Sequence, residues 1–194
     1  MKVVFLKGSP AAGQDPLSNR AAAAVMAALK ANDWQVKAFA LAGMDIKPCR
    51  GCFSCWVKTP GHCVIEGDDQ EPILHAWAGA DLIAFLTPVT FGGYAPELKK
   101  ALDRIIPVLL PFFSKIRGET HHPQRYPRQR HLLAIGTQKQ GDADSESVFR
   151  RLVERNALNM GDVKTTTLVL AGDISLADIE KKLAAEPLFS EVAK

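Results

Sequence analysis

One stretch near the N-terminus decides the fold: KVVFLKGSPAAGQDPLSNRAAAAVMAAL, residues 2–29. Its apolar run, residues 3–6, is short and rich in β-branched side chains, which is typical of a buried parallel strand. The run ends in a Gly-Ser-Pro turn. From Ser18, a good N-cap, apolar residues recur at helical spacing, namely Ala22, Val25, Met26 and Leu29. The stretch therefore predicts a strand, a loop, and a helix that begins near Ser18.

The same alternation continues along the chain. Apolar runs predict further strands at 36–41, 81–86, 131–135 and 164–170, and helical periodicity predicts helices at 71–78, 97–109, 145–158 and 176–184. Such alternation favours an α/β fold, a doubly wound five-stranded parallel sheet with helices on both faces. The chain has 194 residues, so residues 1–194 are expected to form a single domain. In the helix at 97–109, Lys99, Lys100 and Arg104 are expected to point away from the core.

Two segments interrupt this pattern. Residues 44–66, the cysteine loop, hold every cysteine of the chain, and residues 111–130, the surface excursion, are rich in proline and basic residues. The excursion is too polar and too broken for a core element, so it is expected to lie on the surface. Its adjacent histidines, His121 and His122, are expected to be solvated loop residues.

The overall charge excludes some functions. The 24 Lys and Arg are answered by 21 Asp and Glu, and the net charge of +3 falls well short of a nucleic-acid-binding composition. No stretch approaches the roughly 18 apolar residues that a membrane span needs, and no signal peptide is visible. We therefore expect a cytoplasmic protein with reduced cysteines and without nucleic-acid or membrane partners.

The loop after the first strand indicates a phosphate site. It is rich in small and hydroxyl residues and leads into a helix N-terminus, where free N–H groups and the side chains of Ser9, Ser18 and Asn19 form a cradle. The loop lacks the Lys-Ser/Thr of a P-loop and the G-x-G-x-x-G of a dinucleotide site, so a monophosphate fits better. The alternative is an ordinary capped turn.

The loop after the third predicted strand, residues 87–97, suits a flat ligand. It combines aromatic side chains with glycines that let the backbone approach such a ligand closely. Phe91 and Tyr94 could instead be packing residues, which is the better prediction for either one taken singly. In a doubly wound sheet this loop lies beside the phosphate loop, where ligands bind.

Together these motifs resemble the flavodoxin-like NAD(P)H-dependent FMN reductase family, and within it the cysteine-bearing branch of iron–sulfur flavoproteins. The resemblance implies strand order 2-1-3-4-5 with FMN at the strand ends. One departure is Ala11, which stands where relatives often carry Arg after Ser-Pro; Arg20 is the candidate replacement. The implied FMN contacts are Ser9, Pro10, Ser18, Asn19 and Arg20 at the phosphate, Thr87, Pro88, Val89, Thr90, Phe91 and Gly92 at the isoalloxazine ring, and Thr137 in a third wall at 137–141.

The four cysteines, Cys49, Cys52, Cys55 and Cys63, have three open interpretations. A C-x2-C-x2-C run with a fourth cysteine after a Pro-Gly turn can surround one point. The resemblance implies a 4Fe-4S cluster near the flavin, while the residues alone also allow free thiols or zinc. The crowded triple favours a cluster over zinc, because structural zinc usually draws on two separated C-x2-C pairs.

The resemblance implies an enzyme in which a nicotinamide, NADH or NADPH, reduces FMN and the electrons pass to a small-molecule or protein acceptor. No catalytic side chain is predicted, since the cofactor carries the chemistry. The alternative is an electron carrier with a 4Fe-4S cluster on the four cysteines that is reduced by ferredoxin. The family is usually dimeric or tetrameric, which implies a homodimer or homotetramer.

Overall fold

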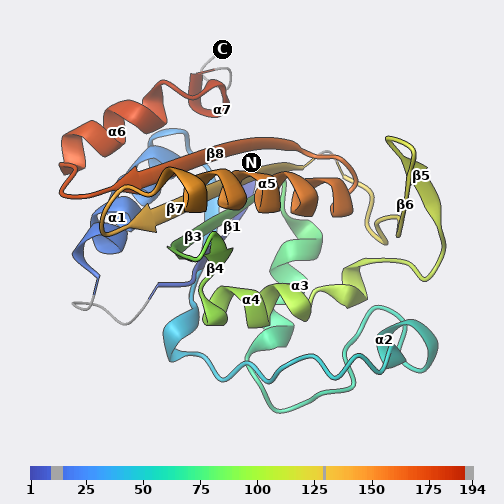
Figure 1. Ribbon diagram of the computed structural model, residues 1–194. Coiled ribbons are helices and arrows are strands. Elements are labelled where there is room, and N and C mark those ends of the chain that lie inside the picture. The colour runs from blue at the N-terminus through green and yellow to red at the C-terminus, as the bar shows by residue number, and fades with distance from the viewer. Residues whose placement is uncertain (10–14, 129, 191–194) are drawn as a thin grey trace.

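A computed structural model describes residues 1–9, 15–128 and 130–190 of the protein (Figure 1). Its main sheet has five parallel strands in the order β2 (Gln35–Ala40), β1 (Lys2–Lys7), β3 (Leu82–Thr90), β7 (His131–Gln138) and β8 (Lys164–Ala171). Because β7 and β8 are the fourth and fifth parallel strands along the chain, this order is the predicted 2-1-3-4-5. The predicted doubly wound flavodoxin-like sheet is confirmed.

Helices cover both faces of the sheet. One face packs on α1 (Pro16–Ala31), α6 (Leu176–Ala184) and α7 (Pro187–Ser190), and the other on α3 (Gln70–Gly79), α4 (Pro96–Asp103) and α5 (Ala143–Asn159). Alternate strand residues serve the two layers: Val3 and Phe5 face α1, whereas Val4 and Leu6 face α3 and α4. Figure 1 shows α6 and α7 above the sheet, and α3 and α4 below it. None of the described helices is long and apolar enough to cross a membrane.

Helix α1 begins earlier than the sequence predicts. Asp15 is the N-cap, and its carboxylate accepts a hydrogen bond from the Ser18 backbone N–H at 3.0 Å. Pro16 occupies the first helical position, where its fixed φ and missing N–H do no harm. The prediction that Ser18 is the N-cap is therefore wrong, and Ser18 is fully buried within the first turn.

Helix α4 is shorter than predicted and hides a charge. It ends at Asp103, and a separate 3-10 turn, η2 (Ile106–Val108), contains Pro107, which cannot continue an α-helix. The prediction that Arg104 points to solvent is also wrong, since only 2% of the residue is exposed. Lys99 is exposed as predicted.

The surface excursion contains a small antiparallel hairpin, β5 (Ser114–Ile116) and β6 (Glu119–His121). His121 is buried against α5, where its Nδ1 lies 2.9 Å from Asn159 Oδ1. The expectation of solvent exposure is therefore wrong for His121. His122 is partly exposed, and its ring packs against Trp56 and Phe113. A polar segment can bury a histidine when a neighbouring helix supplies a hydrogen-bond partner.

Candidate functional site

The carboxyl ends of three adjacent strands meet at one edge of the sheet. The β-ladder pairs Lys7 with Leu86, Thr87 with Gly136, and Pro88 with Thr137. The loops that follow β1, β3 and β7 therefore surround a cavity of about 900 Å³, the strand-end pocket. This volume lies within the range typical of cofactor sites. Among the predicted site residues, those that line the cavity are Arg20, Pro88, Val89, Phe91 and Thr137.

The first loop holds a hydroxyl without a partner. Ser9 is only 2% exposed, and its Oγ makes no hydrogen bond among the described residues. A buried hydroxyl is normally hydrogen-bonded, so Ser9 leaves an unsatisfied donor at the start of this loop. Its neighbour Gly8 cannot be larger, since a Cβ there would lie 2.6 Å from Leu98 Cβ. The predicted contact Pro10 lies outside the described residues.

The Ser18 hydroxyl is already engaged within the protein. It lies 2.5 Å from Asp15 Oδ2 and 2.9 Å from Thr137 Oγ1. A serine carries one proton, which goes to the carboxylate, so the Thr137 hydroxyl donates to Ser18. This chain of three side chains ties the start of α1 to the end of β7 and fixes one corner of the strand-end pocket.

Two helix N-termini border the pocket. Asp15 and Leu17 from the start of α1 line it, as do Asp142 and Ser145 from the start of α5. The side chain and then the backbone N–H of Ser145 hydrogen-bond the Asp142 carboxylate, which lowers its pKa. Helix N-termini carry partial positive charge, so their convergence favours an anionic or electron-rich ligand. The contribution of α5 was missed from the sequence, although an Asp three residues before a Ser marks its N-cap.

A tight hairpin projects an aromatic ring beside the pocket. β3 runs to Thr90, past the predicted end at residue 86, and pairs with β4 (Gly93–Tyr94). The two turn residues, Phe91 and Gly92, have φ values of 49° and 79°, as a two-residue hairpin requires. Phe91 is 96% exposed, an unusual state for a phenyl ring on a strained backbone. Gly92 is pressed against α5, where a Cβ would lie 2.4 Å from Val148 Cγ1.

Two residues near this hairpin hold the fold instead of lining the cavity. Thr87 Oγ1 accepts a hydrogen bond from the Ala95 backbone N–H at 2.9 Å and donates to the Pro88 carbonyl oxygen at 3.0 Å. Tyr94 is buried, its hydroxyl accepts a hydrogen bond from Asn156, and burial raises its pKa. The packing interpretation of Tyr94 is thus the one that the structure bears out.

The cysteine loop forms a separate cavity. Cys49, Cys52, Cys55 and Cys63 line one small space together with Arg104. Cys49 and Cys52 are exposed and Cys55 is buried, and burial raises the pKa of the Cys55 thiol to about 11. No group of three or more His, Cys, Asp or Glu side chains in the described residues is placed to hold a metal ion. The thiols as they lie give no mononuclear zinc site.

Comparison with known proteins identifies the family. A family model for NADPH-dependent FMN reductases matches residues 1–167. The chain belongs to this family. This membership confirms the predicted resemblance to that family.

Relatives agree with this family assignment. An iron–sulfur flavoprotein of Methanocaldococcus jannaschii is 35% identical over 113 residues, which is 58% of this chain and 55% of that protein. Among solved structures, an NAD(P)H:quinone oxidoreductase from Methanothermobacter marburgensis has a TM-score of 0.64 at 14% identity over 92% of each chain. An FMN-dependent NADH-azoreductase from Bacillus anthracis, in complex with FMN, has a TM-score of 0.63 at 13% identity over 99% of this chain and 96% of its own. The two structures support the fold.

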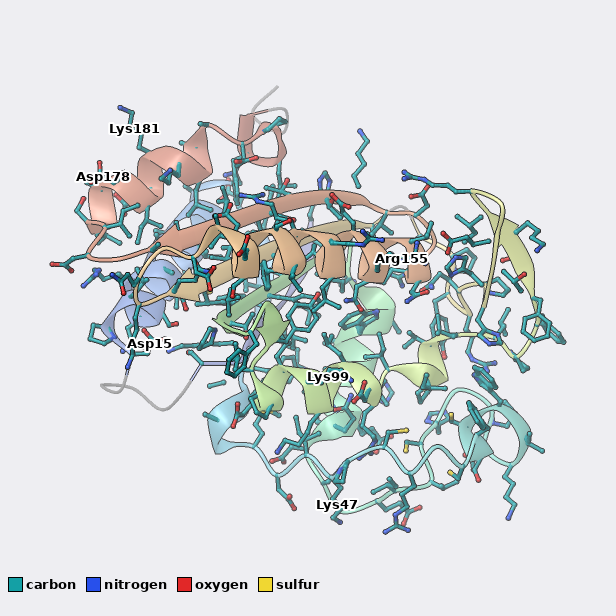
Figure 2. The ribbon with its side chains drawn as sticks, viewed as in Figure 1. Asp15, Lys47, Lys99, Arg155, Asp178 and Lys181 are labelled. Carbon is teal, nitrogen blue, oxygen red and sulfur yellow. The ribbon has the colours of Figure 1, made fainter. Side chains whose placement is uncertain are left out.

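In this FMN reductase family member the cysteines lie away from the strand-end pocket. The two cavities share no described lining residue. The β3–β4 hairpin at the pocket leads into the first residue of α4, and Arg104 at the cysteine cavity follows the last residue of α4. The two cavities are thus separated by this helix of eight residues, which is about 12 Å long. Figure 2 shows Asp15 at the start of α1, and Lys47 far from it in the cysteine loop. One chain therefore has two separate candidate sites.

A buried ion pair fixes both ends of the cysteine loop. Arg104 Nη1 donates to Asp68 Oδ2 at 2.6 Å and to the Lys47 carbonyl oxygen at 2.7 Å, and Nη2 reaches the Ile65 carbonyl oxygen at 3.5 Å. Both charged side chains are almost fully buried. Burial raises the pKa of Asp68, but the hydrogen bonds from Arg104 and from backbone N–H groups outweigh it, so the pKa is lowered. The loop is thus anchored by the protein itself.

We predict that Arg104→Met lowers the free energy of unfolding by about 3–5 kcal/mol, because Asp68 is left as a buried charge without a partner. Lys99→Met is the matched control, since it removes the exposed Lys99–Asp103 pair on the same helix. It should change stability by less than about 0.5 kcal/mol. Urea unfolding of both variants checks this, and equal effects of the two substitutions would contradict the buried anchor.

Proposed function

We propose that the strand-end pocket binds FMN and that the protein catalyses the NAD(P)H-dependent reduction of a small aromatic acceptor such as a quinone. One observation carries the proposal: a cavity of about 900 Å³ lies where the loops after β1, β3 and β7 meet. This is the place at which open α/β sheets bind ligands. The family assignment supports FMN as that ligand.

The phosphate end of FMN would lie at the start of α1. The unpartnered buried hydroxyl of Ser9 and the N-terminal turn of α1 with Asn19 offer donors, and Arg20 lines the pocket nearby. This set suits a monophosphate because it combines neutral donors with positive charge. The Ser18 hydroxyl, which Asp15 and Thr137 already occupy, would stabilise the loop instead of donating to the ligand.

The ring of FMN would lie against the β3–β4 hairpin. Pro88, Val89 and Phe91 form one wall of the pocket, and Thr137, near the end of β7, lies in another wall. The exposed ring of Phe91 would lose its contact with water when a flat ligand covers it. Thr90 and Gly92 would act through the shape of the hairpin, since neither lines the cavity.

FMN supplies hydride and electron transfer, and the protein supplies position and a water-poor surface. No acid–base side chain is required of the protein. The acceptor class is proposed from the solved structures of similar fold, which are described as quinone oxidoreductases and azoreductases. Assembly into a homodimer or homotetramer and a location in the cytoplasm stay predictions.

The protein reconstituted with FMN should show two flavin absorption bands that NADH or NADPH bleaches without air and that a quinone restores. Gly92→Ala should weaken FMN binding by about tenfold, because the new methyl group collides with Val148 and moves the hairpin. Gly118→Ala is the control. Gly118 also has a positive φ, 82°, but its Cβ would meet nothing within 4 Å, and it lies in the β5–β6 hairpin.

Fluorescence titration with FMN measures both affinities. Failure of the folded protein to bind FMN would refute the proposed function. Binding that both glycine variants weaken equally would refute the proposed position of the ring.

A second candidate function is that of an iron–sulfur electron carrier, and one observation favours it. All four cysteines line one cavity inside a loop whose ends Arg104 anchors, so the fold gathers the four thiols in one place. Cys49, Cys52, Cys55 and Cys63 would hold a 4Fe-4S cluster, which would supply single-electron transfer. The similar Methanocaldococcus jannaschii protein is described as an iron–sulfur flavoprotein.

Iron and sulfide analysis and the absorption spectrum of protein purified without air test this second function. A cluster predicts about four iron and four sulfide per chain and a broad absorption that air destroys. Replacing all four cysteines with Ala should abolish the iron and leave FMN affinity unchanged, since the two cavities are separate. Absence of iron and sulfide from protein that was never exposed to air would contradict the carrier function, and stoichiometric zinc would support the zinc alternative.

A further inference from the structure

A lysine side chain lies at the N-terminal turn of α1. Lys7 is the last residue of β1, and its Nζ donates a hydrogen bond to Asn19 Oδ1 at 2.8 Å. Lys7 shares a strand face with Val3 and Phe5, which pack toward α1. The half-buried ammonium is therefore held beneath the start of this helix, next to the loop that contains Ser9.

The charge of Lys7 is not neutralised by the residues around it. The ion pairs of the described residues do not include Lys7. Asn19 is a neutral partner that uses one of three ammonium N–H donors. The carboxylate at this end of the helix, Asp15, hydrogen-bonds Ser18 instead. A half-buried cation at a positive helix N-terminus is unfavourable unless an anion joins it.

The other cation near the pocket is already paired. Arg20 Nη2 lies 3.0 Å from Asp173 Oδ1. This ion pair with the exposed Asp173 links α1 to the loop after β8, and the buried Arg20 Nε has no partner among the described residues. Lys7 differs from Arg20 because it forms no ion pair with a described carboxylate and is hydrogen-bonded to the first turn of α1. From the sequence, Arg20 is the candidate replacement for the Arg that relatives often carry at the position of Ala11. Lys7 is a second candidate for that role, which the sequence pattern did not reveal.

A second observation independently indicates an anion at this place. Ser9, two residues after Lys7, is 98% buried and its hydroxyl has no partner among the described residues. The Ser9 hydroxyl has no described acceptor, and the Lys7 ammonium has one, Asn19 Oδ1, for its three N–H donors. A ligand with several acceptor oxygens and negative charge satisfies both groups, and a phosphate monoester is such a ligand.

We infer that Lys7 supplies the positive charge that binds the phosphate of FMN. The inference rests on the proposed function and goes beyond it by assigning the charge to one side chain. Lys7 acts on binding and does not touch the reacting part of the flavin. Its effect should therefore depend on the phosphate and be absent for riboflavin, which has the same ring and no phosphate.

The test is a fluorescence titration of the flavin-free protein with FMN and with riboflavin. Lys7→Met should weaken FMN binding by about ten- to hundredfold and leave riboflavin affinity unchanged. Lys7→Arg should keep most of the FMN affinity, because it keeps the charge. Lys30→Met is the control, since it removes an exposed lysine from the last turn of the same helix and should change neither affinity.

Three results would overturn the inference. FMN affinity of Lys7→Met within twofold of the parent protein would exclude a phosphate contact. Equal losses for FMN and riboflavin would show a structural role. A phosphate-dependent loss in Arg20→Met alone would assign the charge to Arg20. If the parent protein binds neither flavin, the proposed function itself fails. If the parent binds both flavins, the variants test the role of Lys7 separately from the proposed function.

Discussion

The position of β3 between β1 and β7 is the constraint on which the rest of the structure depends. Parallel pairing puts the carboxyl ends of these strands side by side, so that Lys7 meets Leu86 and Pro88 meets Thr137. The close fit leaves no room for larger residues, since a Cβ on Gly136 would lie 2.6 Å from Val89 Cγ2. The loops after these three strands border the strand-end pocket, and Gly172 and Asp173 after the neighbouring β8 complete its lining. The pocket is therefore a consequence of strand order and register.

The cysteine loop is a second structure attached to this frame. It leaves β2 through a short 3-10 turn, η1 (Leu41–Gly43), and runs along α4 to the buried Arg104–Asp68 pair. Trp56 in α2 (Ser54–Val57) adds a second anchor, since its Nε1 donates to the carbonyl oxygens of Ile106 and Leu109. Because these contacts do not involve the strand ends, the cysteine loop is anchored independently of the strand-end pocket. Within one chain, the thiols and the strand-end pocket are separated by the length of α4.

A third cavity lies on the other side of residues 63–65. It has a volume of about 560 Å³ and is lined by His62, His75 and Glu71, with Arg104 at its boundary. The two histidines lie 4.0 Å and 3.5 Å from Glu71 Oε1. All three side chains are largely exposed, so they resemble a solvated surface cluster more than a built site. The strand-end pocket differs from it because its walls come from the sheet itself.

Patterns of short range predicted most of the fold. Apolar runs and helical spacing report which face an element buries, so they located the five parallel strands, and alternation gave the class. The predictions of solvent exposure failed where a partner that is distant in the sequence makes burial possible. Arg104 has the spacing of an exposed residue, but Asp68, far away in the chain, makes its burial possible. His121 is buried by Asn159 in the same way. At the site, the loops were predictable from the ends of the strands. The hydrogen bonds of Lys7 with Asn19 and of Ser18 with Thr137 depend on side-chain geometry, which the spacing of residues in the sequence does not show.

The central claim is that the strand ends, and no other cavity of the described chain, receive the flavin. A crystal structure of the protein grown with FMN measures this directly. The account predicts flavin density in the strand-end pocket, with the ring against Pro88 and Phe91 and the phosphate at Ser9 and Asn19. Flavin density in the cavity of His62 and His75, with the strand-end pocket lacking it, would contradict the account.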